Sequence, residues 1–264
     1  MRKRIITLTK IIFGLYIILC TVVYFIQEDL IFFPEKLDKN FEFEFNGVYE
    51  ELTFTTNDGV KLNGLLFKST QSKGLIFYLH GNAGSLNTSA LIAKTYTGLG
   101  YDIFMIDYRG FGKSEGDISE QAQLFSDNQI VYDELKKSYK EEDILILGYS
   151  IGTGMATKLA SMNKPKRLIL QAPYYSLVDM MKKKYPYIPT FILKYRFETK
   201  EYLKKCDMPI TIFHGKQDQV IYHGSSVKLM ADFDKINLFT LKNQDHFYIT
   251  RNEQYLLELK KILQ

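Results

Sequence analysis

The sequence predicts an α/β fold in which a mostly parallel sheet is covered by helices on both faces. Short apolar runs, such as Ile144 to Leu147, alternate along the chain with helix-like segments, the pattern of strands joined by crossover helices. This run leads through Gly148-Tyr-Ser-Ile-Gly152 into a helix-like stretch, Thr153 to Ser161, so strand, sharp turn and helix follow one another. In such sheets, ligands bind at the carboxyl ends of the strands.

The composition is that of one sizeable globular domain, and it argues against some classes of function. The chain has 264 residues, of which 46% are hydrophobic and 24% charged. The net charge of +4 is mild, and no stripe of basic residues is interleaved with aromatics, so nucleic-acid binding is disfavoured. The two cysteines, Cys20 and Cys206, lack the spacing of metal ligands and cannot staple the fold. We therefore expect no metal and no cofactor.

The N-terminus has the features of a membrane anchor. The 22 residues from Ile5 to Ile26 carry one charge, Lys10, and as a helix they would be about 33 Å long, enough to cross a bilayer. Basic residues precede this stretch and acidic ones follow it, which puts the N-terminus in the cytoplasm and the domain outside. The alternative is a cleaved signal peptide, but the apolar stretch exceeds the usual length and lacks an A-x-A-like site. We expect residues 1–29 to be an uncleaved anchor.

The remaining elements can be placed in order, from a connector at residues 30–47 into a domain at 48–264. Asn57-Asp58-Gly59 between two strand-like runs is a strong hairpin signal. The runs expected as strands give a sheet of about eight: 48–55, 60–67, 74–79, 102–106, 144–147, 167–171, 209–214 and 235–241. Helices are expected at 87–99, 120–139, 153–161 and 253–263.

Ser150 is the candidate nucleophile. In a strand-turn-helix context, the serine of Gly-x-Ser-x-Gly takes a strained backbone conformation that holds its hydroxyl clear of the sheet. Gly148 and Gly152 remove the Cβ atoms that would collide in so tight a bend. The following helix aims its N–H groups and positive dipole end toward the serine oxygen. The short motif is weak by itself, but its context favours a nucleophile elbow.

An activated serine needs a base. Of the four histidines, His246 alone lies in a loop between the last strand and the last helix, where it can swing over Ser150. His80 and His214 end their strands and are expected to brace neighbouring loops, whereas His223 is expected to be exposed.

The base needs an orienting acid, and Asp218 is preferred. It lies four residues past His214 in a strand-terminal loop, and it gives the chain order Ser, Asp, His. Asp179 is farther from its strand and is read as part of the following helix. Asp245 is next to His246, and chain neighbours rarely point at each other.

The reaction also needs two N–H donors for the oxyanion. One is the N–H of Ile151, directly after the nucleophile. The second is expected from the loop after Leu79, where Asn82 is favoured and Ala83 is the close alternative. A phosphate-binding loop is the competing interpretation of these glycines, but neither glycine-rich phosphate pattern follows a strand here.

Together these motifs resemble the successive signatures of the α/β-hydrolase superfamily: His80-Gly-Asn-Ala-Gly84, Asp107-Tyr-Arg-Gly-Phe-Gly112, Gly148-Tyr-Ser-Ile-Gly152, His214-Gly-Lys-Gln-Asp218 and Asp245-His246. They are most similar to its membrane-anchored serine hydrolases of esterase or acyl-thioesterase type. The resemblance covers about Val48 to the C-terminus. It implies a Ser150, Asp218, His246 triad, structural roles for Asp107 and Arg109, and a short cap between strands six and seven.

Residues 174–206 are the expected cap. They are rich in large apolar side chains and include a basic cluster at 182–184. One interpretation is a pair of helices packed on the sheet with a solvated charge run. The other is an apolar entrance for an acyl chain beside an anionic head group, close to the membrane.

The favoured function is a serine esterase or acyl-thioester hydrolase that forms an acyl-enzyme. Its expected partners are an acyl ester substrate and the membrane, with no metal or cofactor. A peptidase or acyltransferase would use the same residues, and the sequence does not separate them. A non-catalytic binding protein of the same fold is the alternative from another class. It is disfavoured because no member of the triad is missing.

Overall fold

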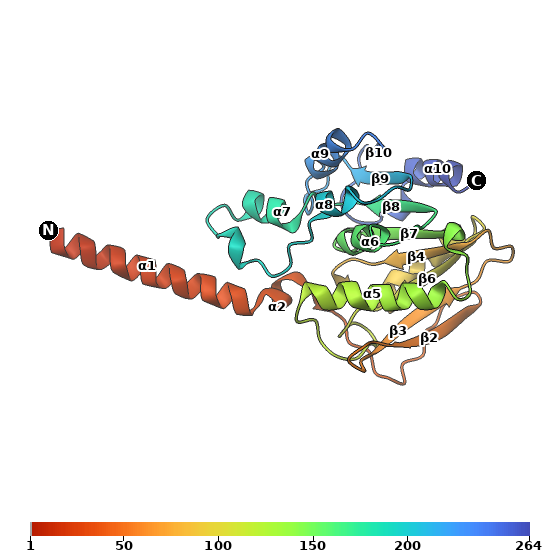
Figure 1. Ribbon diagram of the computed structural model, residues 1–264, viewed down its shortest axis with the longest axis horizontal. Coiled ribbons are helices and arrows are strands. Elements are labelled where there is room, and N and C mark those ends of the chain that lie inside the picture. Colours follow the sequence, from red (N-terminus) through yellow and green to blue (C-terminus); the bar gives the residue numbers. More distant parts are fainter. Residues whose placement is uncertain (1) are drawn as a thin grey trace.

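The computed structural model describes residues 2–264 and contains an eight-stranded mixed sheet (Figure 1). The strands lie in the order β10-β9-β8-β7-β4-β6-β3-β2, and β3 runs antiparallel to both of its neighbours while the other pairs are parallel. The strands are β2 (Tyr49–Thr55), β3 (Lys61–Phe67), β4 (Leu75–Leu79), β6 (Asp102–Ile106), β7 (Ile144–Tyr149), β8 (Arg167–Gln171), β9 (Ile210–Gly215) and β10 (Ile236–Leu241). The expected sheet is confirmed, as is the hairpin that joins β2 to β3.

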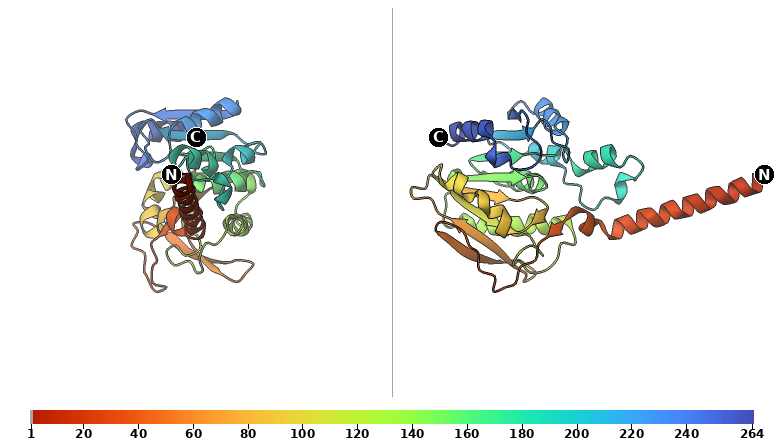
Figure 2. Two further views of the ribbon diagram at one scale, coloured as in Figure 1. Left: turned by 90° about the vertical axis from the view of Figure 1, so that its left-hand side faces the viewer. Right: turned by 180° about the vertical axis from the view of Figure 1, so that it is seen from behind.

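Helices cover both faces of this sheet (Figure 2). Alternate residues of β7 enter two separate cores. Ile144 and Ile146 pack with side chains of α5, α6 and α8, whereas Leu145 and Leu147 pack with those of α4 and α10. The helices of the domain are α3 (Leu86–Ser89), α4 (Ala93–Thr97), α5 (Gln121–Leu135), α6 (Gly152–Ala160), α7 (Leu177–Lys184), α8 (Thr199–Leu203), α9 (Gly224–Asp232) and α10 (Glu253–Ile262), with single 3-10 turns at η1 (Ala90–Ile92), η2 (Glu141–Asp143), η3 (Thr190–Ile192) and η4 (Ile249–Arg251).

Two helical regions differ from the prediction. The helix expected at 87–99 is broken into α3, η1 and α4, in a segment rich in threonine, a weak helix former. Helix α9 is not predicted, because its Gly-Ser-Ser start is typical of a turn. His223 directly precedes α9, is only partly exposed, and places Nε2 2.9 Å from Thr240 Oγ1. The expectation that His223 is exposed is therefore wrong.

The N-terminal segment projects from the domain as a single long helix, α1 (Arg2–Phe25), followed by the short helix α2 (Gln27–Ile31) (Figure 1). No side chain of α1 is buried. Within residues 2–264, α1 is the one helix that is long and apolar enough to cross a membrane. Met1, the first residue of the anchor expected at 1–29, lies outside the described residues.

The connector after α2 forms hydrogen bonds with the loop that follows β4. Strand β1 (Phe33–Pro34) pairs in parallel with β5 (Ala83–Gly84). The Phe33 N–H donates to the Asn82 carbonyl at 2.8 Å, and the Asn82 side-chain amide donates to the Ile31 carbonyl at 2.7 Å. The segment predicted as a connector at 30–47 is thus part of the structure around the expected oxyanion loop.

The cap segment between β8 and β9 contains α7, η3 and α8 and also contacts α2. Gln27 is buried and bonds the cap twice: its Nε2 donates to the Ile192 carbonyl at 2.9 Å, and its Oε1 accepts from the Lys194 N–H at 2.9 Å. Glu28 accepts from the Tyr195 hydroxyl at 2.8 Å and pairs with Lys194 Nζ at 3.1 Å. The base of the N-terminal helix and the cap are therefore joined by polar contacts.

Candidate active site

Ser150 occupies the sharp turn between β7 and α6. Its φ of +53° lies in the left-handed region, so the strained backbone expected of an elbow is present. The flanking glycines are needed for space. A Cβ on Gly148 would lie 2.7 Å from the Cβ of Ala156, and a Cβ on Gly152 would collide with the carbonyl groups of Leu79 and His80. The turn therefore packs against the end of β4 as closely as the backbone allows.

The structure brings Ser150, His246 and Asp218 together from the ends of β7, β10 and β9. His246 Nδ1 lies 2.7 Å from Asp218 Oδ2, and His246 Nε2 lies 3.0 Å from Ser150 Oγ. An ionised carboxylate can only accept a hydrogen bond, so Nδ1 carries the proton and Nε2 is left as an acceptor for the serine hydroxyl. All three side chains are buried, with at most 6% of the residue exposed.

Asp218 is held in its ionised form. Its Oδ1 accepts from the backbone N–H groups of Val220 and Ile221, both at 2.8 Å. Its Oδ2 lies 3.2 Å from His214 Nε2 as well as close to His246. Burial by itself raises the pKa of this carboxyl, but the hydrogen bonds from His214 and His246 outweigh it and hold the pKa well below its usual range. His214 thus braces the acid, in keeping with the role expected for it.

The two alternative acids bond elsewhere. Asp179 lies in α7, as expected, where it accepts from the Tyr222 hydroxyl at 2.6 Å and from Lys228 Nζ at 2.7 Å. Asp245 is exposed and accepts from the Phe247 N–H at 2.9 Å. Asp218 is the carboxylate that reaches His246.

A second histidine and aspartate meet at the ends of β4 and β6. His80 Nε2 lies 3.7 Å from Asp107 Oδ1, too far for a hydrogen bond, and both side chains are buried. Burial lowers the pKa of His80 to about 4, and burial raises the pKa of Asp107 well above its ordinary value. His80 is therefore neutral near pH 7, while Asp107 keeps its proton to a higher pH than an exposed carboxyl does. His80 Nδ1 bonds the Gly81 carbonyl at 2.7 Å, and Asp107 Oδ1 accepts from the Leu86 N–H at 3.0 Å, so the pair fixes both ends of the oxyanion loop.

Arg109 has the structural contacts that the resemblance implies. Its buried guanidinium pairs with Asp127 of α5 at 2.5 Å and with Asp58 of the β2–β3 turn at 2.6 Å. It thereby joins the hairpin to the first long helix of the domain.

The expected oxyanion donors border the same space as the serine. Asn82, Ser150 and Ile151 all line one cavity. Within residues 2–264, the backbone N–H groups of Asn82 and Ile151 donate to no backbone carbonyl in a turn or loop. Ala83 lies in β5, is exposed, and lines a second cavity without Ile151. This geometry favours Asn82 over Ala83 as the partner of Ile151.

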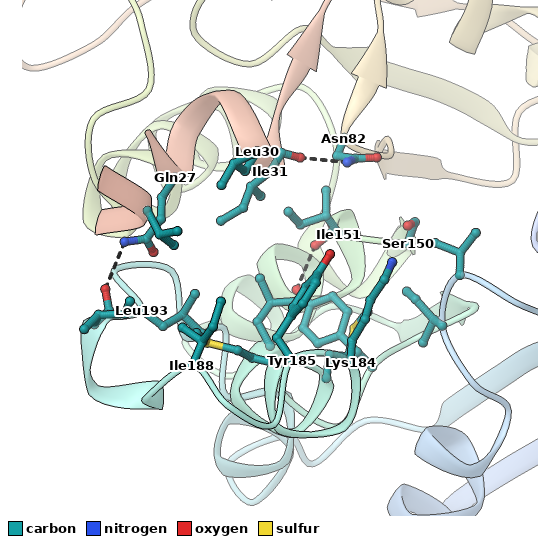
Figure 3. A pocket seen from close by; sticks show the side chains of 18 of the residues that line it. Gln27, Leu30, Ile31, Asn82, Ser150, Ile151, Lys184, Tyr185, Ile188 and Leu193 are labelled. Atoms are coloured by element: carbon teal, nitrogen blue, oxygen red, sulfur yellow. Dashed lines mark hydrogen bonds between the residues drawn. The ribbon is translucent and has the colours of Figure 1, made fainter. Parts of the chain in front are cut away.

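Two cavities meet at Ser150. The first, of about 680 Å³, is mainly apolar and is bounded by α1 and α2 on one side and by the cap on the other (Figure 3). The second, of about 650 Å³, is bordered by the loop after β10 and by α4, and its lining includes Lys94 and Arg251. Neither set of lining residues in 2–264 contains an aspartate or glutamate. The arrangement can hold an apolar group on one side of the serine and a polar group on the other.

Some residues of the site were missed in the sequence. The buried Tyr174 donates to the Ile151 carbonyl at 2.9 Å, and the Tyr149 hydroxyl donates to the His246 carbonyl at 3.0 Å. Gln27, Leu30 and Phe33 line the first cavity although they precede the domain expected at 48–264. The amide and acid residues right after the apolar helix are the one signal that could have indicated a docked segment. Among residues 2–264 no cluster of three or more His, Cys, Asp or Glu side chains could hold a metal ion.

Comparison with known proteins identifies related sequences. The family model described as "Serine aminopeptidase, S33" matches residues 70–197. Protein bem46 of Schizosaccharomyces pombe is 31% identical over 190 residues, which cover 67% of this chain and 63% of that protein. The lysophosphatidylserine lipase ABHD12 of Danio rerio is 32% identical over 176 residues, 58% of this chain and 46% of that protein. The chain thus spans less than two thirds of the length of either relative.

Solved structures share the fold. The esterase Pf2001 of Pyrococcus furiosus superposes with a TM-score of 0.69 at 19% identity, covering 88% of this chain and 98% of that one. Est1E of Butyrivibrio proteoclasticus with bound ferulic acid superposes with a TM-score of 0.66 at 20% identity, covering 80% and 96%.

Proposed function

The chain belongs to the α/β-hydrolase superfamily, and from that premise we propose that it is a serine hydrolase that cleaves carboxylic ester or thioester bonds of acyl-chain substrates. The observation that carries the proposal is the unbroken hydrogen-bonded chain from Ser150 through His246 to an ionised Asp218. A scaffold that only binds ligands has no need for a strained serine whose hydroxyl meets a correctly protonated imidazole.

In the proposed mechanism, Ser150 Oγ attacks the acyl carbonyl carbon while His246 Nε2 takes its proton. The tetrahedral intermediate collapses when His246 returns that proton to the leaving alcohol or thiol, which leaves an acyl ester on Ser150. Water then attacks the acyl-enzyme with His246 again as base, and His246 gives that proton to Ser150 Oγ as the acyl–Oγ bond breaks and the acid product leaves. Asp218 holds the tautomer and stabilises the imidazolium, because its carboxylate bonds Nδ1–H at 2.7 Å.

The oxyanion is assigned to the N–H groups of Ile151 and Asn82. Two features support this assignment. Ile151 stands at the N-terminus of α6, where the helix dipole favours negative charge. The carbonyl of Asn82 is fixed by the Phe33 N–H, and its side chain by the Ile31 carbonyl, so the loop is preorganised before substrate arrives.

The two cavities suggest how a substrate is held. We assign the acyl chain to the apolar cavity between α2 and the cap, which Met180, Tyr185 and Ile188 line. The leaving group is assigned to the second cavity, where Lys94 and Arg251 favour a polar or anionic group.

A serine aminopeptidase is the second candidate, because the matching family model carries that description. An aminopeptidase must hold the free α-ammonium group of its substrate, which calls for a carboxylate near the nucleophile. The absence of aspartate and glutamate from both cavity linings in residues 2–264 favours the ester hydrolase.

The same proposal assigns residues 1–29 to a single-pass anchor, 30–47 to the connector and 48–264 to the catalytic domain, with a cap at about 174–206. The basic residues before α1 and the acidic residues after it support a cytoplasmic N-terminus and a domain outside the cytoplasm. A protease added to sealed vesicles of known sidedness tests this topology, and digestion of the domain from the cytoplasmic face contradicts it.

The function is tested by hydrolysis assays on the full chain in detergent micelles. Candidate substrates are p-nitrophenyl esters of increasing chain length, acyl-thioesters and aminoacyl amides. We expect turnover of esters or thioesters that improves with acyl length, and loss of that turnover in Ser150→Ala. Preference for aminoacyl amides would instead support the peptidase, and folded protein without any turnover contradicts the enzyme.

A further inference from the structure

The tip of the cap exposes large aromatic side chains to its surroundings. We call residues Tyr185–Leu193, which connect α7 to η3 and complete that turn, the cap tip. Tyr187 is 87% exposed and Phe191, four positions later, is 83% exposed, and exposed apolar groups that gather in one place mark an interaction surface. The nine residues carry no charge. In Figure 1 the cap tip lies on the side of the domain from which α1 projects.

The cap tip lies alongside the apolar helix. The Tyr16 hydroxyl donates to the Tyr187 carbonyl at 2.7 Å. Tyr16 is nine residues before Phe25 at the end of α1, about 14 Å along the helix axis, which is close to half the thickness of a bilayer core. The base of the tip is fixed as well, because Gln27 bonds the Ile192 carbonyl.

The backbone of the cap tip is suited to an apolar surrounding. Pro186 and Pro189 have no N–H, and the N–H groups of Ile188, Ile192 and Leu193 donate to carbonyls within the tip. With the N–H of Tyr185, which donates to the Met181 carbonyl, four of the seven N–H groups of the tip have a backbone partner, which lowers the cost of moving this segment out of water.

Charged residues frame the tip on both sides. Lys182, Lys183 and Lys184 form the last turn of α7 directly before it. Lys194 and Arg196 follow it. Basic side chains on either side of an aromatic, uncharged loop are the arrangement of a segment that enters the interfacial region, with its cations at the level of the head groups.

We propose that the cap tip is embedded in the same leaflet as the C-terminal half of α1 and that the apolar cavity opens into the bilayer between them. Leu30 of α2 lies on one side of this opening, and Tyr185, Ile188 and Leu193 lie on the other (Figure 3). Val23 of α1 also lines the cavity. Ser150 lies at the inner end. An acyl chain then enters laterally from the leaflet without crossing water, so the substrate class is a membrane-resident acyl ester. This inference rests on the proposed hydrolase function and on the anchor.

The absence of tryptophan from the chain provides a direct test. Phe191→Trp places a single fluorophore on the cap tip, and Tyr187→Trp provides a second, independent position. Val48→Trp is the matched control. Val48 is 74% exposed and precedes β2, whose amino end lies at the edge of the sheet opposite to Ser150.

Each variant of the full chain is placed in phosphatidylcholine–phosphatidylglycerol vesicles with and without brominated acyl chains. We expect blue-shifted emission and strong quenching by the brominated lipid for Trp at 191 and 187, and neither effect at 48. Emission at 191 and 187 that matches the control, in protein that floats with the vesicles, overturns the inference. Such a result would indicate that the exposed aromatics bind protein or a second copy instead.

An activity measurement tests the route. Phe191→Asp is expected to lower hydrolysis of a long-chain ester in vesicles by about tenfold, because a charged side chain opposes insertion of the tip into the apolar layer. Hydrolysis of a short, water-soluble ester should be unchanged, because Phe191 does not line the cavity. If Phe191→Asp and the unmodified chain hydrolyse the ester in vesicles at equal rates, the lateral route is contradicted. Absence of all hydrolysis in the unmodified chain contradicts the proposed function instead, and the quenching result remains independent of it.

Discussion

Two histidine–aspartate pairs lie at the carboxyl ends of the strands of this sheet. They differ in the distance between their side chains, in contact with Ser150 and in the pKa shift of the acid. His246 and Asp218 bond at 2.7 Å, and the imidazole reaches Ser150. His80 and Asp107 approach only to 3.7 Å, and His80 Nε2 and Asp107 Oδ2 have no hydrogen-bond partner in residues 2–264. The pKa of the acid is lowered in the first pair and raised in the second. Position at a strand end therefore does not define a chemical role; hydrogen-bond partners and exposure to the substrate cavity do.

The largest contrast is expected from removing each imidazole. His246→Ala should lower kcat by about 10⁴–10⁶, as should Ser150→Ala, because the members of a triad act as one unit. His80→Gln should lower kcat by no more than about tenfold in the folded fraction, since His80 meets no reacting atom. Steady-state kinetics on a p-nitrophenyl ester measure both. Equal losses at the two positions contradict the distinction.

Replacing each acid by its amide compares a carboxyl of lowered pKa with one of raised pKa. Asp218→Asn should lower kcat by about 10⁴, because the amide favours the wrong tautomer of His246. Asp107→Asn should retain activity within about tenfold, since the amide keeps the size of the carboxyl and its oxygen can still accept from the Leu86 N–H. A large loss in Asp107→Asn with intact folding would show that Asp107 is ionised and takes part in the reaction.

The buried imidazole should make stability depend on pH. The pKa of His80 is about 4 in the folded chain and near 6.5 when unfolded, so the unfolded state binds the proton first as pH falls. The contribution of His80 to the free energy of unfolding is then fully present above pH 6.5, and about 3 kcal/mol of it is lost between pH 6.5 and 4.

Urea unfolding in detergent at both pH values, for the wild type and His80→Gln, isolates this contribution. Asp107, with its raised pKa, contributes a slope of opposite sign, but it is present in both proteins. The wild type should lose more stability than His80→Gln on acidification. An identical loss in the two proteins would mean that His80 is not the group that titrates.

The smallest effect on kcat is expected from removing one hydrogen bond that supports the oxyanion loop. Phe33→Pro removes the N–H that bonds the Asn82 carbonyl, and the preceding Phe32 is already extended, as a residue before proline requires. We expect kcat to be about tenfold lower than in Phe33→Ala, because one supporting hydrogen bond is worth up to about 1.5 kcal/mol. KM should change alike in the two variants, since both lose the ring that lines the acyl cavity. Phe33→Ala is the control, since it keeps the N–H and shortens only the side chain. Equal kcat values for the two variants would remove the proposed role of this bond.

Much of the fold and the core of the candidate site could be predicted from sequence because the signals are local. The strand before Gly148, the helix after it and the hairpin turn at Asp58 are each encoded within a few residues. The order of Ser150, Asp218 and His246 then followed from strand-end positions, and the structure brings these three together.

Other features depend on contacts between distant segments. The pairing of Phe33 with Ala83 joins two-residue strands 50 positions apart, which leave no periodicity to recognise. Gln27 looked like the polar end of an anchor, and only its contacts with Ile192 and Lys194 reveal it as part of the cap interface. The raised pKa of Asp107 depends on burial, which a single sequence does not supply.

The central claim is that Ser150 is a nucleophile activated by His246. It is tested most directly by treating the folded full chain with a fluorophosphonate probe and locating the adduct by peptide mass spectrometry. We expect one adduct, on the peptide that contains Ser150, with no labelling in Ser150→Ala and much slower labelling in His246→Ala. Folded protein that remains unlabelled, or an adduct on another residue, would contradict the account.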